Sequence, residues 1–576
     1  MFLLLKRDKV LSNGIWRSAH DFVGSCRQRG HQIHSLHGHD APRAFIRAFL
    51  KLPKLMSLSM PSYKTLLLSL FAVLTVQQAI TAIMRYSQPK SSLLAALSSL
   101  NIVSAQSYSN QTCNSNSTVD LSWHAPAQAK VNSLSSAING TGTYGFVFNS
   151  SQGPLDTYNY CNMPHVNPKT YPRVKDDGYK LEYVEVIHRH HKRTPYASNT
   201  FPVENYPWYC DDEGLFYGGQ PINPDSNPSA DTYWSVYTSP TNPFTPEGFA
   251  GTCQFPQITR GGLDDSHKHG ADLKSVYHDL LHFIPADYSP SAVSYRVTNN
   301  VITSQVASML IAGMYPSQAN TNTPLHIQPS SIDSLEPKYS CPASTSLLAS
   351  YGPGSSSPAW LEHLNAAAPL FARLDALSGV SPDSSSWHQS LDHYFDNLSS
   401  RLCHAKPLPC SASDPSDCVS TADAEQVFRL GEYEYSFIYR DAPASLRATA
   451  ASYGVWVAEL AQNLRGAMGR GEESSVPGSE VRYRHNVAHD GSMSRLLSVL
   501  QLDKMVWPGM GAEVVFELYS KGGCYFVRVL WGGQVLKSSR PGFGEMSMVP
   551  VEEVLGYFDG LAGVGAEKVE GLCDAE

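Results

Sequence analysis

The stretch LEYVEVIHRHHKRTP, residues 181–195, constrains the fold more than any other part of this chain. Its first residues, about seven of them, are mostly apolar and rich in β-branched side chains, which predicts a largely buried strand. Six basic or titratable side chains follow from His188 to Arg193, and Pro195 ends any regular element. Because open α/β sheets form their ligand crevice at the carboxyl ends of strands, we expect a functional site here.

The basic run holds the residue types that phosphoryl transfer requires. A neutral imidazole of His190 can attack phosphorus, while Arg189 and Arg193 can hold the phosphoryl oxygens in forked, charge-assisted hydrogen bonds. Lysine would serve less well at the two arginine positions, because it lacks a planar fork of donors. Two other interpretations fit the run alone. It could be a solvated basic loop, or a loop that binds nucleic acid or a metal ion through His188, His190 and His191.

The charge distribution argues against nucleic acid as a partner. Residues 1–64 hold 11 Lys and Arg against three Asp, a net charge of +8. Since the whole chain carries −8, the remaining residues carry −16. An acidic main body repels a phosphate backbone, so we expect no nucleic-acid partner. With 576 residues, of which 42% are hydrophobic, the chain has ample material for a large core.

The N-terminal region, residues 1–105, has the features of a targeting segment. Residues 65–84 carry no charge and are long enough to cross a bilayer, and basic residues dominate before them, which is typical of a cytoplasm-in anchor. A competing prediction starts translation at Met84 and takes residues 84–105 as a cleaved secretory signal. Gln77 and Gln78 weaken the anchor, so we favour the signal. A membrane partner is expected only if residues 65–84 are an uncleaved anchor.

Sequons and cysteines also predict export. Four of five N-glycosylation sequons lie in residues 106–180, a segment rich in Ser, Asn, Gly and Pro that we expect to wrap the surface. The five asparagines are Asn110, Asn116, Asn139, Asn149 and Asn397. Cys26 precedes the apolar segment, and the ten cysteines after it allow five disulfides in an oxidising compartment. We therefore expect a secreted or extracellular glycoprotein, with a single-pass membrane protein as the alternative.

A second predicted strand ends in a His-Asp pair. Residues 481–488 have the pattern of a strand, and residues 494–502 that of a helix. His489 and Asp490 lie between the two elements. Because the N-terminus of a helix favours anions, this junction is a second candidate for a phosphate-binding position.

The two motifs together resemble those of the histidine acid phosphatases, a branch of the histidine phosphatase superfamily. Arg189, His190, Arg193 and Pro195 match R-H-x-x-R-x-P, and the His-Asp pair follows some 300 residues later, as in the family. The resemblance implies that His190 is the nucleophile and that Arg189, Arg193 and His489 bind phosphate. It also implies that Asp490 is the general acid, which protonates the leaving oxygen and later activates water. The family uses no metal ion and no cofactor.

The same resemblance implies an α/β fold, a three-layer sandwich around a central mixed sheet of the phosphoglycerate-mutase kind. Its two halves are residues 181–340 and 471–576, and the resemblance extends from about residue 181 to 561. Strand patterns at 293–297, 512–518 and 524–530 and a closing helix at 550–561 fit this core. Between the halves, residues 341–470 show helical patterns at 359–377, 386–403, 422–439 and 443–468, with Asp441 as the N-cap of the last. We expect an inserted, mainly α-helical cap domain, which in the family shapes the leaving-group side of the pocket.

One position departs from the family pattern. Aligned without gaps, Ile302 occupies the place of the third phosphate-binding arginine, and an apolar side chain cannot hold an anion. The loss of one preorganised donor typically costs about 3 kcal/mol of transition-state stabilisation. Arg260 and Arg296 are candidates to replace it. His267 and His269, on the helix expected after Gly262, are interpreted as a solvated helix face in preference to metal ligands.

Two functions remain open from the sequence. The first is a secreted histidine-type acid phosphatase that hydrolyses phosphate monoesters through a phosphohistidine intermediate. The second is a catalytically weakened extracellular relative that binds phosphorylated ligands, because Ile302 has degraded the site. The substrate is a phosphomonoester in the first case, and the sequence leaves the oligomeric state open.

Overall fold

The computed structural model describes residues 132–140, 158–203, 207–210, 236–237, 241–243, 251–319, 321–469 and 480–574. The expected signal at 84–105, the anchor at 65–84 and the sequons at Asn110, Asn116 and Asn149 lie outside these ranges. Of the helices that are described, none is both long and apolar enough to span a membrane.

The centre of the fold is one mixed sheet. Its strands run in the order β3 (Leu325–His326), β2 (Val293–Val297), β4 (Tyr483–Ala488), β1 (Lys180–Arg189), β5 (Glu513–Lys521), β6 (Cys524–Trp531) and β7 (Gln534–Val535), and β8 (Val549–Pro550) pairs with β6. The first four are parallel, whereas β5, β6 and β7 add antiparallel ladders. The strand expected at residues 181–187 continues two residues further, so that His188 and Arg189 belong to β1.

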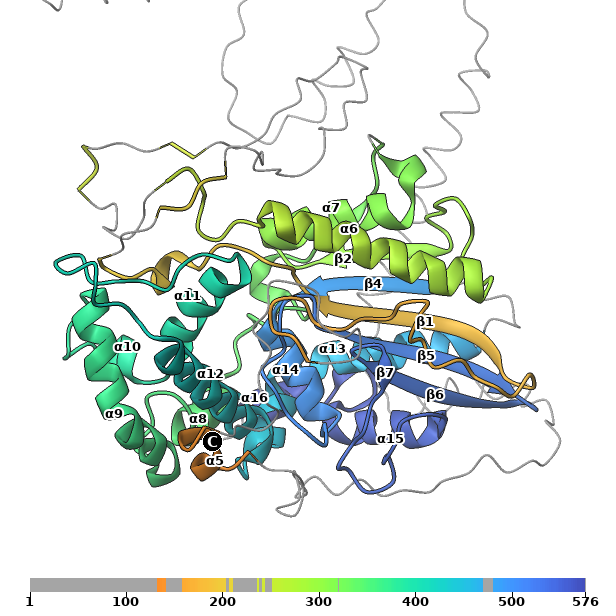
Figure 1. Cartoon of the computed structure of the whole chain (residues 1–576). Helices are drawn as coiled ribbons and strands as arrows, with labels where there is room; N and C mark the ends of the chain where they lie inside the picture. The colour runs from red at the N-terminus through yellow and green to blue at the C-terminus, as the bar shows by residue number, and fades with distance from the viewer. Residues whose placement is uncertain are drawn as a thin grey trace, which may run out of the picture. The chain divides into compact units, whose positions relative to one another are not determined.

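Helices cover both faces of this sheet and make a three-layer sandwich, as the family resemblance predicts. In Figure 1, α6 (Arg260–Lys274) and α7 (Val301–Met314) lie along one face, and α14 (Asp490–Val499) and α15 (Val551–Ala562) lie on the other. Alternate residues of β1 point to opposite faces of the sheet. Val184 and Val186 pack toward α6 and α7, whereas Tyr183 and Ile187 pack toward α14 and α15. Both faces of β1 are therefore covered, and its residues from Tyr183 to Arg189 are all buried.

The two sequence motifs meet because their strands are neighbours. β1 and β4 are parallel, with Arg189 opposite Ala488, so the residues after both strands emerge at the same edge of the sheet. β2 lies on the other side of β4, with Val297 opposite Val487. The carboxyl ends of three adjacent parallel strands therefore build one site from segments that are far apart in the sequence.

The helical insert has its own apolar core. Its helices are α8 (Pro342–Tyr351), α9 (Pro358–Ser378), α10 (Ser385–His388), α11 (Asp392–Cys403), α12 (Thr421–Ser436) and α13 (Ser445–Met468). Buried residues of α9, α11 and α12 form one cluster, which also takes in Tyr160 and Trp507. In contrast, α13 packs on the sheet side with Tyr183 and Ile187, so it completes the core layer although it falls within the expected insert.

One expectation about the chain outside the sheet is wrong. Asp441 is not the N-cap of α13, which is Ala444; instead its carboxylate pairs with Arg440 at 2.6 Å. In the segment before β1, Tyr160 and Cys161 are fully buried and belong to the same apolar cluster as α9, α11 and α12. The short α5 (Leu134–Ile138) packs on α12, and α16 (Val569–Asp574) packs on α8 and α13.

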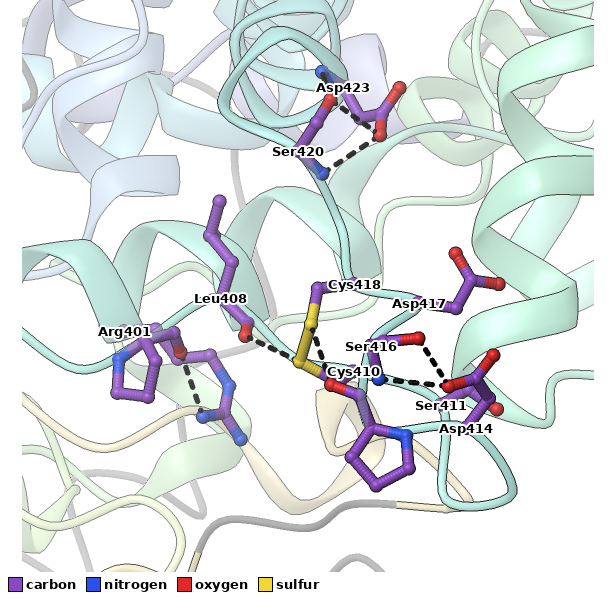
Figure 2. Close-up of a disulfide and its surroundings, with 12 residues drawn as sticks. Arg401, Leu408, Cys410, Ser411, Asp414, Ser416, Asp417, Cys418, Ser420 and Asp423 are labelled. Atoms are coloured by element: carbon purple, nitrogen blue, oxygen red, sulfur yellow. Dashed lines mark hydrogen bonds between the residues drawn. A yellow bond between two sulfur atoms is a disulfide. The ribbon is translucent and has the colours of Figure 1, made fainter.

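Four disulfides join described residues. They link Cys161 to Cys403, Cys210 to Cys253, Cys341 to Cys573 and Cys410 to Cys418, and Cys524 is disulfide-bonded as well. The first ties the segment before β1 to α11. The last closes a short loop before α12, and Figure 2 shows it beside the Ser420 and Asp423 pair that caps this helix.

Candidate active site

His190 follows β1 directly and is oriented by the backbone. Its Nδ1 lies 2.9 Å from the carbonyl oxygen of His191, so Nδ1 carries the proton and donates it to this oxygen. The lone pair is therefore on Nε2. Burial lowers the pKa of His190 well below its usual value, and the neighbouring Arg193 and Arg189 lower it further. A neutral imidazole with its free lone pair on Nε2 is the form that acts as a nucleophile.

Arg189 is held in the core by three acceptors. Its Nη1 donates to the Pro508 carbonyl at 2.6 Å and to the Tyr160 hydroxyl at 3.2 Å, and its Nη2 lies 3.1 Å from Asp490 Oδ2. Nε has no hydrogen-bond partner among the described residues, although it is buried. The side chain is only 1% exposed. Such a fixed guanidinium with an unused donor is suited to bind an anion oxygen.

Arg193 is positioned by the helical insert. Its Nη1 donates to Asp396 of α11 at 3.0 Å, and its guanidinium lies over the Tyr196 ring, 4.2 Å from the centroid. The other oxygen of Asp396 accepts from the backbone N–H of Tyr196 and from Asn199 Nδ2. One carboxylate of the insert therefore fixes both the arginine and the loop that follows it.

His489 lies beside His190, with their ring centroids 5.4 Å apart. Its Nε2 is 2.9 Å from the hydroxyl of Thr298, which follows β2, and 3.6 Å from Glu336. Burial lowers its pKa, an effect that Glu336 and Asp490 oppose. Three adjacent strand ends thus contribute one side chain each to a contiguous polar cluster.

Asp490 is the first residue of α14 and is hydrogen-bonded at both oxygens. Oδ1 accepts from the Gly491 N–H at 2.8 Å, and Oδ2 accepts from Trp507 Nε1 at 3.0 Å and from Arg189. Burial favours a raised pKa, but Arg189, the Trp507 hydrogen bond and Arg193 outweigh it and hold the pKa of Asp490 below its usual value. Its side chain is 24% exposed, so Asp490 is the accessible member of the cluster. Since α14 begins at Asp490, this helix starts four residues before the predicted start at residue 494.

The insert reaches Asp490 through Trp507. The indole ring stacks between Tyr435 of α12, at 3.7 Å, and Phe395 of α11, at 3.9 Å. Its Nε1 is thereby aimed at Asp490. Trp507, Asp396 and Tyr160 were not predicted from the sequence. Nothing near these residues in the sequence marks them, since each acts through a partner from a distant segment.

The position of the missing arginine is apolar throughout. Ile302 is fully buried with Ile258, Val297 and Val487, so it belongs to the core below the site. Arg296 does not replace the missing cation there, because it is bound to Glu459 of α13 at 2.7 Å and to Ser334 at 2.8 Å.

Arg260 is exposed at the first residue of α6. The sequence predicted that His267 and His269 lie on a solvated face of this helix. This prediction is correct for His267, which is exposed, and wrong for His269, which is fully buried.

Comparison with known proteins gives one family. A model described as the histidine phosphatase superfamily (branch 2) matches residues 180–531, more than half of the chain. This range begins at β1 and ends with β6, and it contains both motifs.

Two curated proteins are similar over most of their length. "Counting factor 60" of Dictyostelium discoideum is 24% identical over 387 residues, which cover 65% of this chain and 84% of that protein. "2-phosphoxylose phosphatase 1" of Danio rerio is 22% identical over 428 residues, which cover 66% of this chain and 78% of that protein.

Solved structures similar to this chain include phytases. The apo form of the Hafnia alvei phytase is 13% identical with a TM-score of 0.44, and the match covers 70% of this chain and 100% of the phytase. A multiple inositol polyphosphate phosphatase of Bifidobacterium longum is 10% identical with a TM-score of 0.41, covering 69% of this chain and 96% of that one.

Proposed function

Because this chain belongs to the histidine phosphatase superfamily, branch 2, we propose that it is an acid phosphatase that hydrolyses phosphate monoesters through a phosphohistidine. The family and the phosphatase relative support a hydrolase of phosphoric monoesters in general. The observation that carries the finer proposal is the orientation of His190, whose Nδ1–H donates to the His191 carbonyl and leaves Nε2 free beside two arginines.

In the first step, Nε2 of His190 attacks phosphorus and the bond to the leaving oxygen breaks. Arg189, Arg193 and His489 bind the three remaining phosphoryl oxygens and neutralise their charge. Asp490 gives its proton to the leaving oxygen, so that an alcohol departs. In the second step, Asp490 takes a proton from water, the water oxygen attacks phosphorus, and the P–N bond breaks. The products are inorganic phosphate and the neutral His190 of the starting state.

The proton on Asp490 arrives with the substrate. In the free protein Arg189 and Trp507 keep this carboxyl ionised, since its pKa is held below the usual value. A phosphate monoester loses its second proton near pH 6, so below that pH it binds as a monoanion. Its charge offsets that of Arg189 and Arg193, which raises the pKa of Asp490 and allows the substrate proton to move there. This accounts for the acid optimum that we propose.

We also propose that the chain is exported and glycosylated. The disulfides among the described residues fit an oxidising compartment. Asn139 is exposed at the end of α5, whereas Asn397 is fully buried in α11 and donates to the Asn199 carbonyl. We therefore expect glycan on Asn139 and none on Asn397. Protein purified from medium should begin near Gln106, and an intact Met1 in a membrane fraction would instead establish the anchor.

The experiment that separates the two functions is turnover of 4-nitrophenyl phosphate near pH 5 by the wild type and by His190→Ala. We expect turnover that His190→Ala abolishes while its thermal unfolding stays cooperative. The buried, apolar Ile302 favours the second function, a binder of phosphorylated ligands. A wild-type protein that binds inorganic phosphate but hydrolyses none of several monoesters would establish this alternative.

A further inference from the structure

A group of buried histidines lies next to the segment that carries the proposed nucleophile, on the face of the sheet that α6 covers. Its five members come from the segment before β1, from β1, from the loop after it, from α6 and from β4. They are His165, His188, His191, His269 and His485. Four of them are completely buried, and the phosphatase chemistry described above uses none of their side chains.

Three of these histidines have the spacing of a metal site. One ring nitrogen from each of His188, His191 and His269 lies within 4.8 Å of those of the other two. His191 Nε2 and His269 Nδ1 are 3.1 Å apart. Two nitrogens bound to one tetrahedral Zn²⁺ at 2.0–2.1 Å are separated by about 3.3 Å, so this pair already has the required separation. The third nitrogen, on His188, would have to move on the order of 1 Å to reach the same ion.

Two of the rings are held with a lone pair directed away from their hydrogen-bond partners. His188 Nδ1 donates to the Arg189 carbonyl at 2.8 Å, which leaves the lone pair on Nε2. His269 Nε2 donates to Glu513 Oε2 at 2.8 Å, and Glu513 Oε1 is itself held by the Val166 N–H. Metal-binding histidines typically donate their second ring N–H to a carboxylate or a backbone carbonyl in this way.

Two ring nitrogens of the three ligands, His188 Nε2 and His191 Nδ1, also lack any hydrogen bond to the described residues. His188 Nε2 is buried without a partner among the described residues, which is costly for a polar atom in a dry core. His191 shares a proton with His269 and its Nδ1 lies against Gly511. Burial lowers the pKa of all three histidines, so they are neutral, as metal ligands must be.

We propose that His188, His191 and His269 bind a structural divalent transition-metal ion, with Zn²⁺ as the favoured metal. Three imidazoles suit Zn²⁺, whereas Mg²⁺ and Ca²⁺ prefer oxygen ligands. Glu513 supplies a compensating negative charge next to His269. On binding, the proton of His191 moves from Nε2 to Nδ1, so that Nε2 is free to coordinate.

The site would stabilise the loop that carries the nucleophile. His188 and His191 flank Arg189 and His190 in the sequence, and the His191 carbonyl accepts the hydrogen bond that orients His190. A metal ion bound to His188 and His191 would fix both ends of this segment. Its three ligands are not among the residues that bind phosphate or transfer a proton, so the metal ion takes no part in phosphoryl transfer.

The test is the metal content of the tag-free, full-length chain, expressed in zinc-supplemented medium and measured by mass spectrometry. We expect about one zinc per chain in the wild type and an at least roughly tenfold lower content in His269→Gln. The matched control is His267→Gln, a change two residues away on the same helix at an exposed position, which should keep its zinc. Should His269→Gln fail to fold, wild-type protein from cobalt-supplemented medium should show the visible bands of tetrahedral Co²⁺ with nitrogen ligands.

Three results would overturn the proposal. They are a wild type without zinc or cobalt from either medium, a His269→Gln protein that retains full zinc, and a cobalt spectrum typical of octahedral oxygen ligands. None of these depends on phosphatase activity, so the metal site and the proposed function are tested separately.

Discussion

Asp396 of the helical insert and Arg193 of the loop after β1 are bonded at 3.0 Å, although 203 residues separate them in the sequence. The same carboxylate holds the Tyr196 backbone and Asn199, so it fixes the whole turn after the basic run. The insert is therefore not only a cover over the sheet. It positions one arginine through Asp396 and the proposed general acid through Trp507.

This relationship predicts a loss of activity in Asp396→Asn. Without the carboxylate, the Arg193 fork is free to turn, and misplaced catalytic groups commonly cost about a hundredfold in rate. We expect kcat/KM to fall roughly tenfold to a hundredfold, with weaker inhibition by inorganic phosphate. The control is the same kinetic measurement on Asp383→Asn, because Asp383 is an exposed acid of the same insert. Unchanged phosphate inhibition in Asp396→Asn would mean that the pair does not orient Arg193.

The role of Asp490 predicts a dependence on the leaving group. Alkyl leaving groups need a proton, whereas nitrophenolate leaves without one. Asp490→Asn should therefore lose about 10²- to 10⁴-fold in kcat for an alkyl phosphate and much less for 4-nitrophenyl phosphate. Equal losses on both substrates would show that Asp490 is not the general acid.

The lowered pKa of Asp490 predicts where the activity falls on the alkaline side of the pH–rate profile, here called the alkaline limb. Because the free carboxyl is already ionised, the reactive form is the substrate monoanion, and kcat/KM should fall as pH rises through the second phosphate ionisation near pH 6. We expect a bell-shaped profile centred between roughly pH 4 and 6. Substrates with a lower second pKa should shift the alkaline limb downward by the same amount. A limb that stays fixed across substrates would assign it to a group of the protein.

His404 predicts how stability depends on pH. Its Nδ1 donates to the Ser400 carbonyl and its Nε2 accepts from the Thr259 hydroxyl, and burial lowers its pKa to about 4. The unfolded chain takes up this proton near pH 6.5. Between these values the unfolded state binds more protons, so stability falls as the pH drops from about 6.5 to about 4. In thermal melts across this window, His404→Asn should show a shallower decline than the wild type, while the exposed-site control His267→Asn should match the wild type.

The sheet and the two motifs were predictable from local patterns. β1 and β4 each carry strand-forming apolar residues and are followed by one of the two motifs, and the paired motifs identify their edge of the sheet. The placement of Asp396 and Trp507 was not predictable, since each acts through a contact with a distant segment. His269 was misinterpreted for a similar reason. Gly270 and Gly313 bring α6 and α7 so close that a Cβ on either would meet backbone at 2.0 Å, and this packing turns His269 inward.

Trapping the phosphorylated enzyme would test the assignment of His190 as the nucleophile. Brief mixing with ³²P-labelled monoester and a quench that avoids acid, followed by peptide mapping, should place the label on His190, and His190→Ala should carry none. Phosphohistidine survives neutral or alkaline conditions, so the quench preserves the bond that Nε2 forms. Label on Asp490, or no label during measurable turnover, would contradict the assignment of His190 as the nucleophile.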